Sequence, residues 1–408
     1  MSPAVIVVGG GPAGCFAAVT AARRGRSVLL LEANGRLGHK LSITGKGRCN
    51  VTNNCDRDTL MQNIPRGGRF LFSAFARCMP QDVMAFFEAE GVPLKTERGR
   101  RVFPVSDRAQ DIVQALTAAM EHAGVRVRLN ARVRKLILTE GRCTGVTLAD
   151  GTQIESEAVL LATGGMSYPR TGSTGDGLRF AERAGLAVTP MQPSLIPLET
   201  AEDDPQEMQG LSLRNVTLTV TRGKKRIFSD MGELLFTHFG VSGPLVLTAS
   251  CLIDPEQVPE YLLHIDLKPA LSEQQLDLRI QRDFAAAPNK SAANALHGLL
   301  PASLLPVILR RADIPGGQKV STVTKQQRAR LVSCLKNYQL SPAAMRPIAE
   351  AIISRGGVSL KEIDPNTMAC KRIPGLYIAG ELLDADAFTG GFNLQIAFAT
   401  GYAAGCSL

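Results

Sequence analysis

The stretch Ala4-Val5-Ile6-Val7-Val8-Gly9-Gly10-Gly11-Pro12-Ala13-Gly14 decides the fold. Its apolar first half predicts a short buried strand, and its glycine-rich second half opens an alanine-rich helix that stops at Gly25. A second apolar strand, Ser27–Leu31, follows and ends at Glu32. Strand, helix and strand in this order predict a β–α–β unit of a parallel sheet.

The glycines of this unit have the spacing G-x-G-x-x-G, at Gly9, Gly11 and Gly14. They allow a tight turn and let a pyrophosphate approach the N-terminus of the helix, where free N–H groups and the helix dipole favour an anion. Glu32, at the end of the second strand, can accept hydrogen bonds from ribose hydroxyls. The hexapeptide alone also fits a simple glycine-rich turn, but together with the strands and the acid it predicts a dinucleotide site.

The chain has 408 residues, which at about 100–200 residues per domain allows roughly two to four domains. Hydrophobic residues make up 45% and charged residues 20%, which excludes wholesale disorder, collagen-like structure and a coiled coil. The net charge of +9 fits either a polyanionic partner or a basic enzyme without one.

No apolar run approaches the roughly 20 residues needed to cross a bilayer, and the N-terminus lacks the basic start and cleavage site of a signal peptide. We therefore expect a cytoplasmic protein with no membrane partner. Nine cysteines without a CxxC or a Cys/His pairing argue against zinc, an iron–sulfur cluster or a dithiol centre, so no metal site is expected. Most of these thiols should be reduced core residues.

Two further segments belong to the same domain. The apolar strand Ala158–Ala162 ends in Thr163-Gly164-Gly165, and a strand near the C-terminus ends in Gly380-Glu381 before a glycine-led helix expected from Ile396 to Ala404. Strands that end in small-residue turns are expected of a doubly wound sheet, whose ligand lies at the strand carboxyl ends. The two ends of the chain therefore build one domain, and the middle is an insertion.

We place the dinucleotide-binding domain at residues 1–187 and 356–408, an inserted β-domain at 188–270 and 337–355, and a helical subdomain at 271–336. Leu211–Phe236 alternates as two strands around the basic turn Arg222–Arg226. Ser272-x-x-Gln275 is a capping box, and Leu304–Arg311 and Lys325–Leu335 have helical apolar spacing.

Gly9–Gly14, Glu32, Thr163-Gly164-Gly165 and Gly380-Glu381 together resemble the FAD-binding Rossmann fold of glutathione-reductase-like flavoproteins. A narrower resemblance rests on four longer strings. They are Thr44–Asn53 (TGKGRCNVTN), Tyr168–Gly177 (YPRTGSTGDG), Leu235–Pro244 (LFTHFGVSGP) and Gly390–Gln395 (GGFNLQ). These strings are similar to the bacterial BaiN/RdsA family of FAD-dependent oxidoreductases, and the similarity runs along essentially the whole chain. It implies an α/β fold in which the FAD domain is interrupted by a β-domain with a helical subdomain.

The resemblance implies FAD as the bound cofactor and NAD(P)H as the hydride donor. Only one complete dinucleotide fingerprint is present, so the nicotinamide would dock transiently, or the substrate itself would reduce the flavin. The candidate cofactor-binding residues are Gly9, Gly11, Pro12, Ala13, Gly14, Glu32, Ala33, Lys40, Gly47, Arg48, Cys49, Asn50, Val133, Thr163, Gly164, Gly380, Glu381, Gly391, Asn393, Leu394 and Gln395.

Several of these residues have a specific expected role. Reduced flavin gathers negative charge at N1 and O2, so the helix N-terminus at Gly391–Gln395 suits that end of the ring, although a plain helix cap has the same sequence. Lys40 and Arg48 suit a pyrophosphate or an anionic substrate, although loop cations are often only solvated. Gly380 and Glu381 are expected near the pyrophosphate and the ribityl chain.

Two residues are candidate catalytic groups. The Cys49 thiol could protonate the carbon next to the one that receives hydride, but most lone cysteines are core residues. His238, at the exit of an inserted strand, could donate a proton or bind a substrate carbonyl or phosphate, or it could only cap local backbone.

Members of the family reduce uridine to dihydrouridine in large-subunit ribosomal RNA, reduce conjugated double bonds in bile-acid derivatives, or carry an aminoacetone-oxidase annotation. Basic residues are dense over residues 95–135 and 310–336, which suits a phosphate backbone. The absence of Trp and the 5% aromatic content leave few base-stacking side chains, and a charge run is usually a solvated face. The leading expectation is C=C reduction of uridine in 23S ribosomal RNA, with a small-molecule enone reductase and an amine oxidase as alternatives.

Overall fold

The computed structural model describes residues 2–408. Its contacts divide the chain into two units: the first ends at Ser194 and resumes from Ile348 to Leu408, and the second is Leu195–Pro347. Strand β11 (Val188–Ser194) falls in the inserted domain as drawn from the sequence, and β19 (Ile353–Val358) crosses its predicted boundary at residue 355. The two strands pair antiparallel with each other inside the first unit. The domain boundaries stay a prediction.

A five-stranded parallel sheet in the order β20-β10-β1-β2-β6 forms the centre of the first unit. Its strands are β1 (Val5–Val8), β2 (Val28–Leu31), β6 (Arg126–Arg128), β10 (Ala158–Leu161) and β20 (Leu376–Ile378). Every residue of β1 and β10 is buried, as expected for parallel strands that are covered on both faces. The strands predicted around the first glycines and before Thr163 and Gly380 are confirmed.

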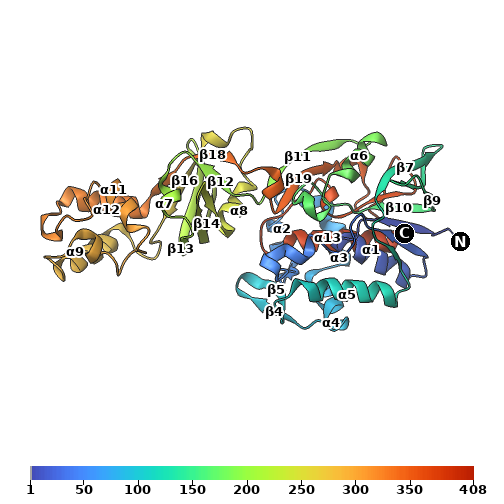
Figure 1. The fold of residues 1–408 in the computed structure, drawn as a ribbon, viewed down its shortest axis with the longest axis horizontal. Coiled ribbons are helices and arrows are strands. Elements are labelled where there is room, and N and C mark those ends of the chain that lie inside the picture. Colours follow the sequence, from blue (N-terminus) through green and yellow to red (C-terminus); the bar gives the residue numbers. More distant parts are fainter. Residues whose placement is uncertain (1) are drawn as a thin grey trace. The chain divides into compact units, whose positions relative to one another are not determined.

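Helices α1 (Pro12–Arg23) and α13 (Phe392–Ser407) lie side by side in the first unit (Figure 1). Glycine permits this close approach, since a Cβ atom on Gly401 would lie 2.4 Å from the carbonyl oxygen of Ala13. Helix α13 begins at Phe392 and not at Ile396, so the predicted start was wrong. Gly391, with φ of 98°, is the left-handed residue from which the helix starts directly.

The remaining elements of the first unit surround this centre. The helices are α2 (Arg57–Gln62), α3 (Gly68–Arg77), α4 (Pro80–Ala89), α5 (Ala109–His122) and α6 (Asp176–Arg183). Two small antiparallel sheets are formed by β3 (Thr52–Asn53), β5 (Arg101–Pro104) and β4 (Leu94–Glu97), and by β7 (Val133–Thr139), β8 (Arg142–Leu148) and β9 (Gln153–Glu155).

The second unit is built on a seven-stranded antiparallel sheet in the order β17-β16-β13-β14-β15-β12-β18. Its strands are β12 (Leu198–Thr200), β13 (Ser212–Arg222), β14 (Lys225–Thr237), β15 (Gly240–Ser242), β16 (Tyr261–Asp266), β17 (Tyr338–Leu340) and β18 (Pro342–Met345). The predicted pair of strands around the basic turn is confirmed as the β13–β14 hairpin.

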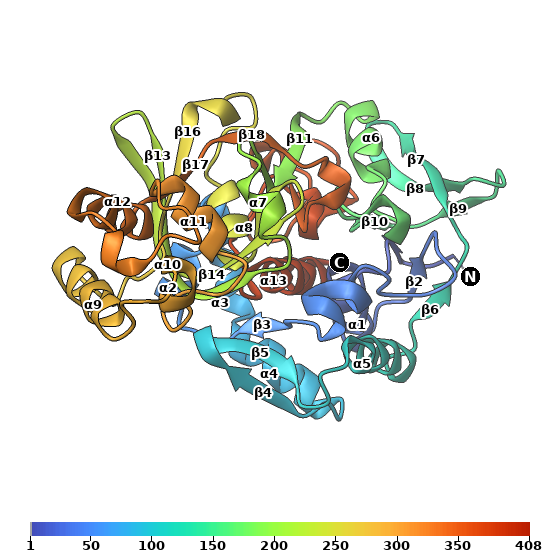
Figure 2. The same cartoon turned by 60° about the vertical axis from the view of Figure 1, so that its left-hand side comes forward.

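In the chain, helix α7 (Asp204–Glu207) lies between β12 and β13, and helix α8 (Pro244–Ser250) lies between β15 and β16. Four more helices lie between β16 and β17. These are α9 (Glu273–Ala285), α10 (Ala292–Ala295), α11 (Leu305–Arg311) and α12 (Lys325–Lys336), grouped together in Figure 2. The capping box of α9 is confirmed, because Ser272 Oγ accepts from the N–H of Gln275 while the Gln275 side chain bonds back. Of the helices in residues 2–408, none combines the length and apolar character needed to cross a membrane.

Candidate functional site

The turn after β1 needs two of its glycines for its own packing. Gly9 has φ of 110°, and a Cβ atom there would lie 2.4 Å from the carbonyl oxygen of Ala162. A Cβ atom on Gly14 would lie 2.0 Å from the carbonyl oxygen of Gly9. Both approaches are far inside van der Waals contact, so these positions accept only glycine in this conformation.

Gly11 differs from both. Its φ is −84°, which any residue can adopt, and a Cβ atom there would meet no protein atom within 4 Å. The open space lies at the N-cap of α1, where no side chain caps the helix and Pro12 occupies the first turn. The glycine motif predicts a pyrophosphate at this place, and the protein leaves room for one here. The pyrophosphate would accept hydrogen bonds from the free N–H groups of the first turn.

Glu32 is buried with a carboxylate already oriented. Its Oε2 accepts from the Gly10 N–H at 2.7 Å, and its Oε1 accepts from both the backbone N–H and the side chain of Asn34 at 2.8 Å. A carboxylate offers about four acceptor positions, so it can still receive a ribose hydroxyl. Asn34, which also donates to the carbonyl of Thr171, was missed in the sequence analysis. Its only signal is its place two residues after the acid.

Lys40 and Glu381, both expected to contact the cofactor, are hydrogen-bonded to each other. Lys40 Nζ lies 2.7 Å from Glu381 Oε2 and 2.6 Å from Ser167 Oγ. Glu381 Oε1 accepts from the N–H of Ser354 at 2.9 Å and from the hydroxyls of Ser354 and Ser167. The Lys40 ammonium is therefore already paired with a carboxylate, which weakens its predicted role as a cation for pyrophosphate.

Arg48 is also paired within the protein. Its guanidinium lies 2.5 Å from Glu97 Oε1 and 2.5 Å from Asp107 Oδ1, and it stacks over Phe103 with 4.1 Å from its central carbon to the ring centroid. The two carboxylates raise the pKa of Arg48. Its charge is neutralised locally, so it offers little attraction to an anion.

Cys49 has no exposed surface, although its backbone is left-handed with φ of 58°. Burial raises the pKa of its thiol to about 12, against a smaller opposing effect of a hydrogen bond with Thr44. A side chain without open surface cannot contact a substrate in this conformation. The proposed role of Cys49 as proton donor stays a prediction, and this burial argues against it.

Two buried polar atoms, one in the residue after Cys49 and one in the turn after β10, have no hydrogen-bond partner: Asn50 Oδ1 and Thr163 Oγ1. Both residues were predicted to bind the cofactor. Buried polar atoms in native proteins are nearly always satisfied, so each such atom needs an explanation, and a bound ligand is one.

Helix α13 starts without a side-chain cap. Asn393 turns away from the open end, since its Oδ1 accepts from the Ala387 N–H at 2.9 Å and its Nδ2 donates to the Ala387 carbonyl at 2.8 Å. Gln395 is fully buried and bonds Thr52 Oγ1 and the Cys78 carbonyl. These side chains brace the helix, and only its first-turn N–H groups remain for an anionic ring edge.

The other predicted cofactor residues of the first unit differ in burial and backbone conformation. Ala33 and Gly47 are exposed, Ala13 and Val133 are buried, and Leu394 packs partly against the core. Gly164 has φ of 73°, and Gly380 has φ of 74° with its N–H bonded to Thr400 Oγ1 at 3.0 Å.

Tyr168 is an unpredicted feature of the first unit. This aromatic residue has φ of 49° and is 36% exposed. The Tyr168 N–H bonds the Ala349 carbonyl, and its carbonyl accepts from Thr171, so the left-handed turn is held from both sides. Its sequence neighbour Ser167 bonds Lys40, Glu381 and the Ile352 carbonyl, so the chain at Tyr168 adjoins that ion pair.

His238, in the second unit, is exposed, and its ring contacts only that of Phe239 among the described aromatic rings, at 4.9 Å. Its catalytic role stays a prediction.

The basic helices of the second unit are largely neutralised. Arg310 pairs with Asp204 and Glu207, and Arg328 lies 2.6 Å from Asp277. Arg311, Arg330 and Lys336 pair with Asp204, Asp313 and Asp266. The segment 310–336 itself contains a single acid, Asp313, and the other carboxylates, Asp204, Glu207, Asp266 and Asp277, come from other elements. Lys319 and Lys325 are exposed and form no ion pair within residues 2–408. The phosphate contact suggested for this run stays a prediction, and the five pairings argue against it.

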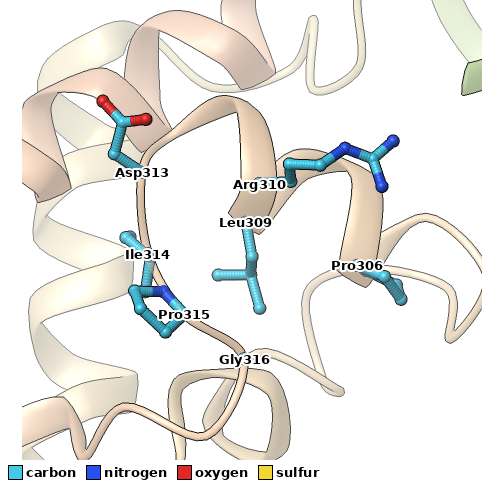
Figure 3. Close-up of a pocket in the computed structure, with 7 residues that line it drawn as sticks. All are labelled: Pro306, Leu309, Arg310, Asp313, Ile314, Pro315 and Gly316. Carbon is cyan, nitrogen blue, oxygen red and sulfur yellow. The ribbon is translucent and has the colours of Figure 1, made fainter.

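A surface pocket of the second unit lies between α11 and the loop after it. It is lined by Pro306, Leu309, Arg310, Asp313, Ile314, Pro315 and Gly316 (Figure 3). None of the predicted site residues lines it, and Arg310 at its edge is already engaged by acids.

The first unit therefore fits FAD on its own geometry. Gly11 leaves room at an uncapped helix, Glu32 holds an oriented carboxylate, two buried polar atoms lack partners, and α13 presents a second uncapped N-terminus. A doubly wound parallel sheet with this site defines the class of dinucleotide-binding flavoproteins.

The chain belongs to the HI0933-like protein Rossmann domain family, whose sequence model matches residues 3–407. It is an FAD-dependent oxidoreductase. It is 32% identical over 402 residues to a protein of Escherichia coli (strain K12) named ribosomal RNA dihydrouridine synthase, with 98% of this chain and 96% of that one covered. It is 29% identical over 404 residues to the 3-dehydro-bile acid delta(4,6)-reductase of Clostridium scindens, with 98% and 97% covered. Among solved structures, 3-ketosteroid delta1-dehydrogenase from Sterolibacterium denitrificans shares the fold with a TM-score of 0.50 and 14% identity, over 99% and 98% of the two chains.

Proposed function

We propose that this protein reduces uridine to dihydrouridine in large-subunit ribosomal RNA, with NAD(P)H as the hydride donor. The observation that carries the proposal is the 32% identity, over nearly the full length of both chains, to the Escherichia coli ribosomal RNA dihydrouridine synthase. An enzyme with this substrate works where ribosomes are made, so we propose a cytoplasmic location.

The chemistry suits the substrate. The C5=C6 bond of uracil is conjugated with a carbonyl, so C6 accepts hydride and C5 then takes a proton. FAD, when bound, supplies the two-electron carrier between NAD(P)H and this double bond.

The chain's own residues would bind and orient these groups. The space at Gly11 and the N-terminus of α1 would hold the pyrophosphate, and Glu32 the ribose. The N-terminus of α13 would stabilise negative charge at one end of the flavin ring. His238 is exposed and Cys49 is fully buried, so His238 is the better candidate proton donor.

A second candidate is reduction of a small conjugated enone, favoured by the 29% identity to the Clostridium scindens bile-acid reductase over the same length. Both substrates are carbon–carbon double bonds conjugated with a carbonyl, so one site could be adapted to either. Mass spectrometry of ribosomal RNA from a strain lacking the gene tests the choice. We expect dihydrouridine to disappear from one large-subunit position and to return with the wild-type gene, but not with a Gly11→Val gene. Unchanged dihydrouridine would overturn the RNA proposal and direct attention to enones as oxidants of the reduced flavin.

A further inference from the structure

The turn of the β13–β14 hairpin carries three consecutive cations without ion-pair partners in the described part of the chain. Lys224, Lys225 and Arg226 are exposed and make no ion pair or hydrogen bond with any side chain of residues 2–408. Arg222, on the other side of the turn, instead lies 2.7 Å from Glu260 and over the ring of Tyr261. Four other exposed cations of residues 195–347 also form no ion pair there: Arg214, Lys290, Lys319 and Lys325. Within residues 195–347, only the tip places three such cations next to one another in the chain.

The outward face of the same hairpin is a row of hydrogen-bonding groups. Val216, Leu218 and Val220 are buried, so alternation directs Thr217, Thr219 and Thr221 to the other face.

The groups on this face are linked to one another. The Thr219 hydroxyl lies 2.9 Å from Ser229 Oγ, and the Thr221 hydroxyl lies 3.1 Å from His264 Nε2. The strand register sets Arg226 opposite Thr221, so the polar row leads directly to the cations of the tip. Asp266, opposite Thr217, is neutralised by Lys336 at 2.6 Å. Asp230 of β14, opposite the inward-facing Leu218, is exposed and accepts a hydrogen bond from the Met231 N–H.

We propose that the hairpin tip and this threonine-rich face bind the sugar–phosphate backbone of the RNA substrate. This inference rests on the proposed function. Lysine and arginine neutralise phosphates, while hydroxyl and imidazole groups bond phosphate oxygens and 2′-hydroxyls. The residues opposite the three outward threonines are Ser229, Arg226, His264 and Asp266, together with the apolar Met231 and Leu262. None of them is aromatic, so the face offers no side chain to stack on bases, and we expect it to read backbone shape and not sequence.

The test uses the FAD-loaded full chain and a short fluorescein-labelled RNA hairpin, with anisotropy measured over a series of salt concentrations. The variant combines Lys224→Ala, Lys225→Ala and Arg226→Ala. We expect roughly tenfold weaker binding or more at physiological salt, and a slope of log affinity against log salt that is smaller by up to about 2–3, since each lost phosphate contact removes about 0.7–0.9. FAD content and flavin reduction by NAD(P)H should be unchanged.

A matched control removes three exposed cations that form no ion pair within residues 2–408 and that belong to the basic run at residues 95–135 of the first unit: Arg126→Ala, Arg134→Ala and Lys135→Ala. This control should bind RNA nearly as the wild type does. A second variant, Thr219→Val with Thr221→Val, keeps every charge and should weaken binding without changing the salt slope.

The outcomes separate the two proposals. If the wild type binds RNA and the tip variant binds it with the same affinity and slope, the hairpin surface is wrong and the proposed function stands. An equal loss in the control would mean attraction by net charge alone and would also overturn the hairpin assignment. If the wild type binds no RNA while small enones reoxidise its flavin, the proposed function fails, and this inference fails with it.

Discussion

Lys40 Nζ lies 2.7 Å from Glu381 Oε2, an ion pair between residues separated by 341 positions in the chain. Both side chains are about four-fifths buried, and Ser167 and Ser354 complete the hydrogen bonds. The four residues come from the segments after β2, after β10 and after β20, and from β19. The pair therefore ties both ends of the chain together at the carboxyl edge of the parallel sheet.

Removing one partner of this pair should cost more than removing an exposed pair. We expect Lys40→Met to lower the free energy of unfolding by about 1–3 kcal/mol, because the Glu381 carboxylate loses its cation while remaining largely buried. Urea unfolding measures the change, and Lys40→Met with Glu381→Gln should recover part of it. The exposed Arg330–Asp313 pair is the control, and Arg330→Met should cost at most about 0.5 kcal/mol. Equal costs at the two sites would contradict the role given to Lys40.

Gly11→Val should yield a folded protein without FAD. The valine side chain would enter the space at the α1 N-terminus, where a Cβ atom meets no protein atom within 4 Å. The thermal unfolding midpoint of the apo-protein should therefore hold while the flavin absorbance is lost. Gly14→Ala is the contrasting variant, because its Cβ atom would clash with the Gly9 carbonyl and the fold itself should suffer. Stoichiometric FAD in Gly11→Val would show that the pyrophosphate binds elsewhere.

Cys49 should contribute to loss of stability at high pH. Burial raises its pKa from 9.0 to about 12, so the unfolded chain loses the thiol proton first as pH rises, and the stabilising difference present below pH 9 declines between pH 9 and 12. At pH 10 one such group accounts for about 1 kcal/mol. We expect the fall in unfolding free energy from pH 8 to pH 10 to be smaller by that amount in Cys49→Ala. The same variant should reoxidise its flavin with substrate at the wild-type rate. A large loss there would restore Cys49 as proton donor.

His238→Ala should separate the two half-reactions. If His238 donates the proton or binds the substrate carbonyl, substrate should reoxidise the reduced flavin about 10²-fold more slowly, while NAD(P)H reduces it at the normal rate. Stopped-flow absorbance of the flavin follows both steps, and His238→Gln tests whether hydrogen bonding alone suffices. Wild-type rates in both steps would leave the histidine with a local structural role.

Arg328→Glu should act on stability and not on RNA. The change places a carboxylate against Asp277, whose pKa is now lowered mainly by its hydrogen bond from Arg328. We expect the unfolding free energy to fall by about 1–2 kcal/mol, with RNA affinity close to that of the wild type once the protein is folded. Weak RNA binding by a fully stable Arg328→Glu protein would contradict this prediction and would show that α12 contacts RNA.

The sequence by itself determined the Rossmann core, because its signals are local. The apolar runs before Gly9, before Thr163 and before Gly380 became the central strands β1, β10 and β20, and the spacing of the first glycines placed the helix that follows. The capping box at Ser272 and the hairpin around Gly223 also follow from neighbouring residues alone.

Only the tertiary structure decided which polar groups are free. From the sequence, Arg328 is an available cation, but in the fold it pairs with Asp277. Lys40 is likewise predicted as a phosphate ligand, but in the fold it pairs with Glu381 from the other end of the chain. The side chains of Asn393 and Gln395 are satisfied by distant loops, whereas Lys224, Lys225 and Arg226 meet no partner. Charge pairing acts through space over a few ångströms, so residue order does not reveal it, whereas strand, turn and cap propensities act along the chain and can be read directly.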